Sequence, residues 1–524
     1  MSRRHRFLIL PSPDRPLPHR WTDWLRLAIV VVLLAAGIPG VPFVVNRLGC
    51  FGGVFPSADI WRVEGECVGL SDDAYAFDRA EFAAVMSVIK SQNDAAAGKC
   101  APQGSEVVVG VLLTMTDRFS GVRAVHELEG MAAGQRQANG TGCLHPMRLV
   151  VGQVGAYGDG NASAEVAARL ARYDKVVAVA GIGLSNQRAA EVADLLAAAK
   201  IPMVSDLITA EGFDQHGSRE DEPDFTGCDP GSYQRGVGKD YFYRVAYRSA
   251  AQVKRLKEVT DGQPDFIMVP TGGSDPYTCT TLPLVQRAFG GKVTEVKFDT
   301  DEPSTVPQTA KRVCAAAKDV RVVYVARGRD LGRLLYNLDE AQRNGQCAAT
   351  SITVLSTSDG QRIRVAETDP VLEDFRVKAL RSGTFASGRL RLLTTLVGGA
   401  DRARADTPNF AAFEQAFTSA GFDPSHIDNG WPVNAYDALT TIAEALRTLP
   451  ATAPVRPSEV NTAIGGFSSS GQSVPGAGGP ITFDNAGNRT DAGPPVVRVC
   501  PLPEASGATP ARTISALLPA DCPR

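Results

Sequence analysis

Gly181-Ile-Gly-Leu-Ser-Asn-Gln187 and Ile201-Pro-Met-Val-Ser-Asp-Leu-Ile-Thr209 are two apolar stretches that each run out into short polar side chains. The residues between them have helical spacing and an apolar face. This pattern predicts a strand–helix–strand unit in which Ser185, Asn186 and Thr209 follow the carboxyl ends of two strands. Ligands bind at such ends in open parallel sheets. The same residue types also cap helices and close turns, so both roles stay open here.

The layout of this unit recurs along the chain. An uninterrupted apolar run at residues 107–113 predicts a first buried strand, and strands then alternate with helices as far as residue 355. A polar, acidic stretch at residues 214–239 interrupts the rhythm and is predicted to be a surface insertion. Alternation at this spacing is typical of parallel sheets covered by helices on both faces. We therefore expect an α/β protein with two similar Rossmann-like lobes.

Length and composition fit a globular protein of several domains. The chain has 524 residues, of which 44% are hydrophobic and 21% charged, and its net charge is −3. That length allows two or three domains. The near-neutral charge gives no electrostatic reason to expect a nucleic acid as partner.

A membrane anchor is expected near the amino terminus. Residues 1–26 are basic, and residues 27–45 carry no charge. At about 1.5 Å per residue, the uncharged segment nearly spans a hydrocarbon core of about 30 Å. The arginine excess places residues 1–26 in the cytoplasm and everything after the anchor outside. Two alternatives remain open: a cleaved signal peptide, and lipid attachment at Cys50 in Arg47-Leu-Gly-Cys50.

The cysteines agree with an extracytoplasmic location, where disulfides form. The ten cysteines are Cys50, Cys67, Cys100, Cys143, Cys228, Cys279, Cys314, Cys347, Cys500 and Cys522. Pairing between sequence neighbours is expected, such as Cys314 with Cys347 and Cys500 with Cys522. The chain has only six histidines and no Cys-x-x-Cys pair, which argues against a metal site.

From about residue 106 to residue 499 the chain resembles the type I periplasmic solute-binding proteins, the branched-chain amino-acid receptors of ABC importers. Residues 107–121 and 181–209 carry part of the likeness. Asn434-Ala-Tyr-Asp-Ala-Leu439 is similar to the family's late helix. Gly479-Pro-Ile-Thr-Phe-Asp-Asn-Ala-Gly-Asn488 is similar to its final hairpin and is the most specific match. The amino-terminal anchor is similar to that of actinobacterial members.

The resemblance implies two lobes joined by three crossings that close over a ligand. The implied segments are a cytoplasmic tail at 1–26, an anchor at 27–45, a linker and helix at 46–105, lobe 1 at 106–243 and 352–467, lobe 2 at 244–351 and 468–502, and a tail at 503–524.

The resemblance also implies ligand contacts on this chain. Ser185, Asn186 and Thr209 occupy the places from which members hold an amino acid's α-groups, although Asn186 departs from the usual serine or glycine. Asp359 occupies the place of an acidic residue that often takes the ligand amine; the alternative is that it caps the segment after it.

From lobe 2, Tyr277 is the expected aromatic cover, and Arg327 stands where members have a second aromatic residue. A guanidinium in the cleft would favour a ligand with an extra carboxylate or phosphate. The alternative is that Arg327 pairs with Asp330 on the surface.

No catalytic set is evident. Gly-x-Ser-x-Gly, His-Glu-x-x-His and P-loop motifs are absent, and His126, His145, His216 and His426 are scattered. We therefore expect a protein that is not an enzyme and has no cofactor. Three functions stay open: capture of a small polar ligand for an ABC permease, ligand sensing through a membrane partner, and a non-binding interaction domain.

Overall fold

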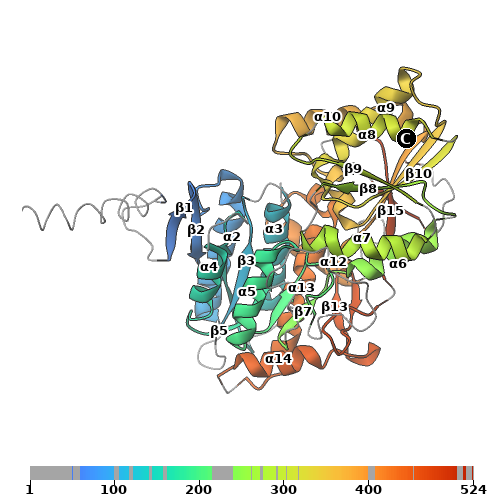
Figure 1. Ribbon diagram of the computed structural model, residues 1–524. Coiled ribbons are helices and arrows are strands. Elements are labelled where there is room, and N and C mark those ends of the chain that lie inside the picture. The colour runs from blue at the N-terminus through green and yellow to red at the C-terminus, as the bar shows by residue number, and fades with distance from the viewer. Residues whose placement is uncertain are drawn as a thin grey trace, which may run out of the picture.

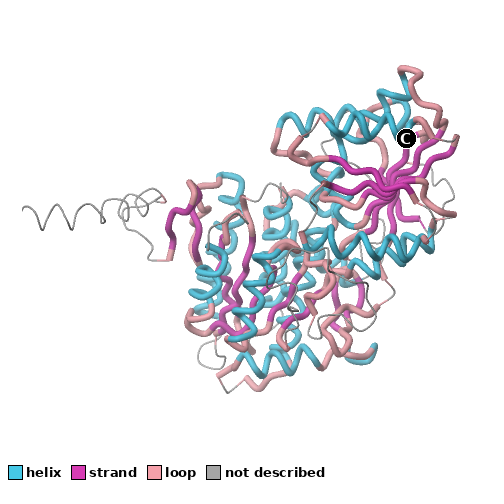
Figure 2. Tube along the Cα trace, viewed as in Figure 1, coloured by secondary structure: helices cyan, strands magenta, loops and turns pink. Residues whose placement is uncertain are grey.

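The computed structural model describes residues 50, 59–99, 106–116, 122–140, 144–156, 162–214, 240–260, 262–271, 275–290, 293–302, 304–316, 318–398, 408–451, 454–491, 493–503, 511–514 and 522. Two α/β lobes stand side by side, each with a twisted sheet between layers of helices (Figures 1 and 2). The predicted pair of Rossmann-like lobes is therefore confirmed. The expected anchor and the insertion at 215–239 lie outside the described residues. Among the residues that are described, no helix is long and apolar enough to cross a membrane.

Lobe 1 is built on a seven-stranded sheet of order β1-β2-β4-β3-β5-β6-β7. Its strands are β1 (Ile60–Val63), β2 (Glu66–Ser71), β3 (Val107–Leu113), β4 (Met147–Gln153), β5 (Val176–Gly181), β6 (Met203–Ser205) and β7 (Phe242–Arg244). Its helices are η1 (Ala80–Phe82), α2 (Ala83–Lys99), α3 (Arg123–Gly140), α4 (Ala162–Leu170), α5 (Gln187–Ala198), α12 (Pro408–Ser419), η5 (Pro424–Asn429), α13 (Trp431–Arg447) and α14 (Pro457–Gly465). A short segment with η6 (Ser470–Gln472), β13 (Val474–Gly476) and β14 (Gly479–Ile481) follows α14, and its hairpin packs on α13.

Lobe 2 has a second seven-stranded sheet, of order β16-β15-β12-β11-β10-β8-β9. Its strands are β8 (Phe266–Pro270), β9 (Thr294–Phe298), β10 (Asp319–Tyr324), β11 (Ser351–Ser356), β12 (Leu390–Thr395), β15 (Val496–Val499) and β16 (Ala511–Ile514). Its helices are α6 (Ser249–Val259), α7 (Pro276–Phe289), α8 (Thr305–Cys314), η2 (Gly328–Asp330), α9 (Leu331–Arg343), η3 (Ser358–Arg364), α10 (Pro370–Leu380) and α11 (Gly383–Ala386). Helices α6 and α7 lie on one face of this sheet and α8 to α10 on the other (Figure 1).

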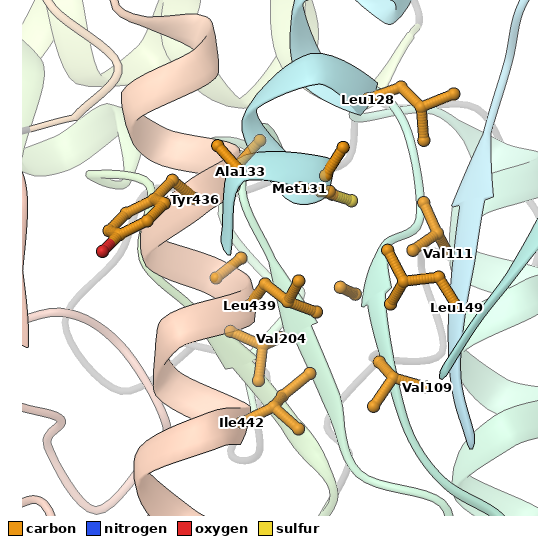
Figure 3. Packing of buried hydrophobic residues seen from close by; sticks show 14 of the residues in the cluster. Val109, Val111, Leu128, Met131, Ala133, Leu149, Val204, Tyr436, Leu439 and Ile442 are labelled. Carbon is orange, nitrogen blue, oxygen red and sulfur yellow. The ribbon is translucent and has the colours of Figure 1, made fainter. Parts of the chain in front are cut away.

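Burial of both sheet faces explains the apolar runs in the sequence. All seven residues of β3 are buried, as expected for a strand in a parallel sheet with helices on both sides. On one face, Leu128 and Met131 of α3 and Leu439 of α13 pack against Val109 and Val111 (Figure 3). The two helices make the most extensive helix pair in lobe 1 and seal the sheet on that side.

The lobe boundaries differ from those expected. Strand β11 pairs in parallel with β10 and with β12, so residues 352–395 belong to lobe 2 and the chain returns to lobe 1 only after β12. The segment expected to be a linker at 46–105 supplies β1, β2 and α2 to lobe 1, because β2 pairs antiparallel with β4. The expected tail supplies β16, which pairs with β15. β1, β2 and β16 are short strands at or next to the edges of their sheets. Segments this short show little of the alternating pattern that predicts a strand.

Three of the expected disulfides are present between sequence neighbours: Cys50–Cys67, Cys314–Cys347 and Cys500–Cys522. Cys279 is also disulfide-bonded. The first bond ties the start of the described chain to β2, and the second joins the end of α8 to the segment before β11. Each bond therefore fixes a connection at the margin of a sheet.

Replacing Cys314 and Cys347 together by serine should destabilise lobe 2. The bond closes a loop of sequence separation 33, so its loss should cost about 3–4 kcal/mol through the entropy of the unfolded chain. Calorimetry should show the melting temperature of lobe 2 reduced by roughly 10 °C. A melting temperature equal to that of the unmodified protein would show that the bond adds nothing to stability.

Candidate functional site

The candidate site begins at the carboxyl ends of β5 and β6 in lobe 1. Ser185 is buried, and its Oγ accepts hydrogen bonds from the backbone N–H of Thr209 at 2.9 Å and of Ala210 at 3.1 Å. Asn186 is the N-cap of α5, and its Oδ1 accepts from the N–H of Ala189 at 2.8 Å. The side chains of Ser185 and Asn186 thus close a turn and cap a helix, as the structural alternative in the sequence predicted. Thr209 is brought next to Ser185 by the same turn.

Lobe 2 contributes a charged group at the ends of β8, β10 and β11. Arg327, which follows β10, donates from Nη2 to Asp275 Oδ1 at 3.0 Å and from Nη1 to Asp359 Oδ2 at 3.1 Å. Its guanidinium carbon lies 4.5 Å from the ring centroid of Tyr277. The Tyr277 hydroxyl is hydrogen-bonded to Thr357 Oγ1. The alternative that Arg327 pairs with Asp330 does not hold, because Asp330 pairs with Arg333 at 2.6 Å.

A glycine permits this arrangement. Helices η2 and η3 approach so closely that a Cβ at Gly328 would lie 2.1 Å from the carbonyl oxygen of Asp359. Any side chain at Gly328 would push the two segments apart. The residue beside Arg327 therefore sets the distance at which its guanidinium meets the Asp359 carboxylate.

Two contacts carry the charged group across to lobe 1. Arg327 Nη2 also donates to the carbonyl oxygen of Ser185. Arg123, the first residue of α3, donates from Nη2 to Asp359 Oδ1 at 2.9 Å. The Asp359 carboxylate is thereby shared between one arginine of each lobe. We call Arg123, Asp359, Arg327 and Asp275 the interlobe charge chain.

The charges in this chain are stabilised by one another. Burial by itself would raise the pKa of Asp359, but the guanidinium groups of Arg327 and Arg123 hold that pKa below its usual value. Burial works against the charged form of Arg327, yet Asp275 and Asp359 raise its pKa. Burial raises the pKa of Tyr277, so its ring stays neutral beneath the guanidinium. Asp359 and Arg327 therefore both stay ionised at neutral pH.

The chain rests on a small apolar cluster drawn from both lobes and from the crossings. Its buried members are Leu184, Leu207, Ala246, Val397 and Trp431, with Val122 and Val365 packed against them. The Arg123 guanidinium lies 4.9 Å from the centroid of the Trp431 ring. Apolar walls exclude water and so strengthen the ion pairs between the lobes.

Sequence reasoning missed Arg123, Asp275 and Trp431. Arg123 had a detectable signal, because a cation in the first turn of a helix opposes the helix dipole and needs a tertiary partner. Asp275 precedes Pro276 in the pattern of an N-cap followed by proline, and its Oδ1 does cap α7 at the N–H of Thr278. That signal predicts the cap and not the second contact with Arg327.

Comparison with known proteins is informative only at the level of structure. No protein-family model and no curated protein matches the sequence. Solved structures do match: LivJ, the branched-chain amino-acid substrate-binding protein of Streptococcus pneumoniae, crystallised with isoleucine, gives a TM-score of 0.54 at 13% identity over 78% of this chain and 99% of LivJ. The fold is that of the type I periplasmic binding proteins.

Two further structures agree with this assignment. The leucine-binding protein LivK of Thermotoga maritima gives a TM-score of 0.53 at 17% identity, over 79% of this chain and 100% of LivK. A solute-binding protein of an ABC transporter from R. palustris, in complex with 4-hydroxybenzoate, gives 0.52 at 16% identity, over 78% and 96% of the two chains. All three are binding proteins by description. In this fold, the interlobe charge chain connects the two lobes through Arg123 and Arg327.

A buried pair of acids beside the cleft should make stability depend on pH. Burial raises the pKa of Asp206, which follows β6, to about 7, and burial and Asp206 together raise the pKa of Glu127 on α3. Below about pH 4 the Asp206 carboxyl is protonated in folded and unfolded protein alike. Between about pH 4 and 7 only the folded protein holds this proton, so the free energy of unfolding falls as pH rises.

The Asp206→Asn variant should lose much of this slope, so that between pH 4.5 and pH 7.5 it loses less stability than the unmodified protein, by about 3 kcal/mol at most. Calorimetric melting temperatures across that range measure the effect. Asp94→Asn, at an exposed acid paired with Lys90, is the matched control and should keep the slope of the unmodified protein. An unchanged slope in Asp206→Asn would contradict the assignment.

Proposed function

We propose that this protein is an extracytoplasmic solute-binding protein that captures a small carboxylic acid between its lobes for an ABC-type importer. The observation that carries the proposal is Arg327, whose guanidinium lies between the lobes and contacts Ser185 of lobe 1 as well as Asp275 and Asp359 of lobe 2. A planar guanidinium binds a carboxylate through two parallel hydrogen bonds.

Asp275 marks the place that the ligand would take. Its side chain is 34% exposed, whereas that of Asp359 is 6% exposed. Because the Asp275 side chain is partly exposed, water can replace Arg327 as its partner, so a ligand carboxylate can displace Asp275 at a lower cost than Asp359. Asp359 is held by two arginines and is not available in this way.

The net charge of the side chains around the proposed ligand position limits which kinds of ligand can bind there. Without Asp275, two arginines face one aspartate, which leaves a net charge of about +1 for a ligand carboxylate to neutralise. Asp359, the residue expected to take a ligand amine, has both carboxylate oxygens on arginines. The ligands named for the neighbouring structures are isoleucine, leucine and 4-hydroxybenzoate, which share a carboxylate. We therefore favour an acid that lacks an α-amino group.

A thermal-shift and calorimetric screen tests this proposal. The purified protein is titrated with 4-hydroxybenzoate and simple 2-oxo acids on one side, and with leucine and isoleucine on the other. The acids should raise the melting temperature and the amino acids should not. A rise in melting temperature with leucine alone would contradict the proposal that the ligand lacks an α-amino group. Failure of every ligand would favour the non-binding interaction domain.

Substitutions at Arg327 and Asp275 should have opposite effects on acid binding. Arg327→Ala should weaken it by about 10- to 100-fold, because a hydrogen bond to a charged group contributes about 1.5–3 kcal/mol. Asp275→Asn should strengthen it, because the competing carboxylate is removed. Arg255→Ala, at a surface pair with Glu258, is the matched control. Unchanged affinity in Arg327→Ala would overturn the assigned contact.

The proposed location is the outer face of the cell membrane, with residues 27–45 as the anchor and residues 1–26 in the cytoplasm. Support comes from the charge pattern and from the disulfides, which form outside the cytoplasm. Protease treatment of intact cells separates the alternatives. Digestion of the lobes with a protected amino-terminal tag supports the anchor. Recovery of the protein in the soluble fraction, cut after residue 45, would show a cleaved signal peptide.

A further inference from the structure

Two histidines that lie 300 positions apart in the sequence meet on lobe 1, outside the interlobe charge chain. His126 and Glu129 are one turn apart on α3 and share a face of that helix. His426 comes from η5, which packs against them. One ligand atom from each of the three side chains lies within 4.8 Å of those of the other two. The scattered histidines of the sequence thus include a convergent pair, together with a carboxylate.

The three side chains are held in place by specific contacts. The imidazole rings of His126 and His426 stack with centroids 4.0 Å apart. His426 Nδ1 lies 2.8 Å from Glu129 Oε2. His126 Nδ1 lies 2.8 Å from the amide nitrogen of Asn429, whose oxygen accepts the N–H of Trp431 at 2.9 Å. These contacts hold the three side chains close together in the metal-free protein.

We propose that His126, Glu129 and His426 form a binding site for a divalent transition-metal ion of the zinc type. Two imidazoles and one carboxylate are a common zinc ligand set that leaves a fourth position for water or another ligand. Ligand atoms around tetrahedral zinc stand about 3.4 Å apart, given bonds of about 2.1 Å. The ligand atoms now lie within 4.8 Å of one another, so the side chains would have to rotate to reach that spacing on binding the ion. His426 is partly exposed, which gives the ion a path from solvent.

The neighbouring charges permit a cation at this position. Glu129 supplies one negative charge, and His426 gives up its contact with Glu129 to the ion. Arg123 lies one turn before His126 on α3. Its positive charge is already paired with the Asp359 carboxylate, at 2.9 Å. The site and the interlobe charge chain therefore share α3 and Trp431 without sharing a ligand.

Asn429 makes the proposal testable by a gain of affinity. Because Asn429 Oδ1 is held by Trp431, its amide nitrogen faces His126 Nδ1, so the ring proton lies on Nε2. Coordination through Nε2 requires that proton to move to Nδ1, and the Asn429 amide must then turn to accept it. A carboxylate in place of the amide would accept from Trp431 and from His126 at once. Carboxylate–histidine–zinc arrangements of this kind strengthen metal binding.

The experiment uses the full chain in detergent, with no polyhistidine tag and after treatment with a chelator. Titration calorimetry with Zn²⁺ should show one equivalent bound at this site, and Zn²⁺ should raise the melting temperature. His126→Ala, His426→Ala and Glu129→Ala should each weaken binding by at least about 100-fold, since loss of even an outer partner costs about 10- to 100-fold. Asn429→Asp should strengthen binding about 10-fold.

His145→Ala is the matched control, because His145 is a buried lobe 1 histidine beside Met147, away from the three proposed ligands. Its affinity for Zn²⁺ should equal that of the unmodified protein. Circular dichroism checks that each variant is folded. Absence of zinc binding by the unmodified protein would overturn the proposal. So would zinc binding that survives in the His126→Ala/His426→Ala double variant, or weaker binding in a folded Asn429→Asp variant.

Discussion

The carboxylate of Asp359 is shared by Arg123 of lobe 1 and Arg327 of lobe 2, and these buried charges must remain paired. Removing one partner of a buried ion pair typically costs about 3–5 kcal/mol, because the other charge is left without a partner. Here the charges sit between two lobes, and the proposed function requires those lobes to separate. Opening exposes them to water and relieves the cost without unfolding either lobe. Under the proposed function, pairing of these charges and closure of the lobes are coupled, and a ligand would act by changing the partner of Arg327.

The crossings restrict how the lobes can move. Three segments pass between them and are hydrogen-bonded to one another: Tyr247 N–H to Val397 O at 3.0 Å, Leu396 N–H to Pro495 O at 2.9 Å and Arg244 N–H to Gly487 O at 3.0 Å. They form one hydrogen-bonded strip between the lobes, so the lobe movement that the proposed function requires would be a rotation about that strip.

The sequence is informative where structure is local and much less so where it is not. The apolar runs predicted β3, β5 and β6, and Ser185 and Thr209 do follow the ends of β5 and β6. The partners of Arg327 could not be predicted, because Ser185 is 142 positions away and its contact depends on how the lobes are rotated. The same holds for His126 and His426. The boundary at β11 was misplaced because buried parallel strands of the two lobes look alike in sequence.

Small-angle X-ray scattering on residues 46–524, dialysed free of ligand, tests the central claim that the interlobe charge chain holds the lobes closed. The account predicts that the unmodified protein scatters as the closed arrangement in the absence of ligand. It also predicts that Asp359→Ala, which leaves two arginines facing each other, has a larger radius of gyration with an unchanged circular dichroism spectrum. An unmodified protein that is already open, and whose radius does not change in Asp359→Ala, would contradict the account.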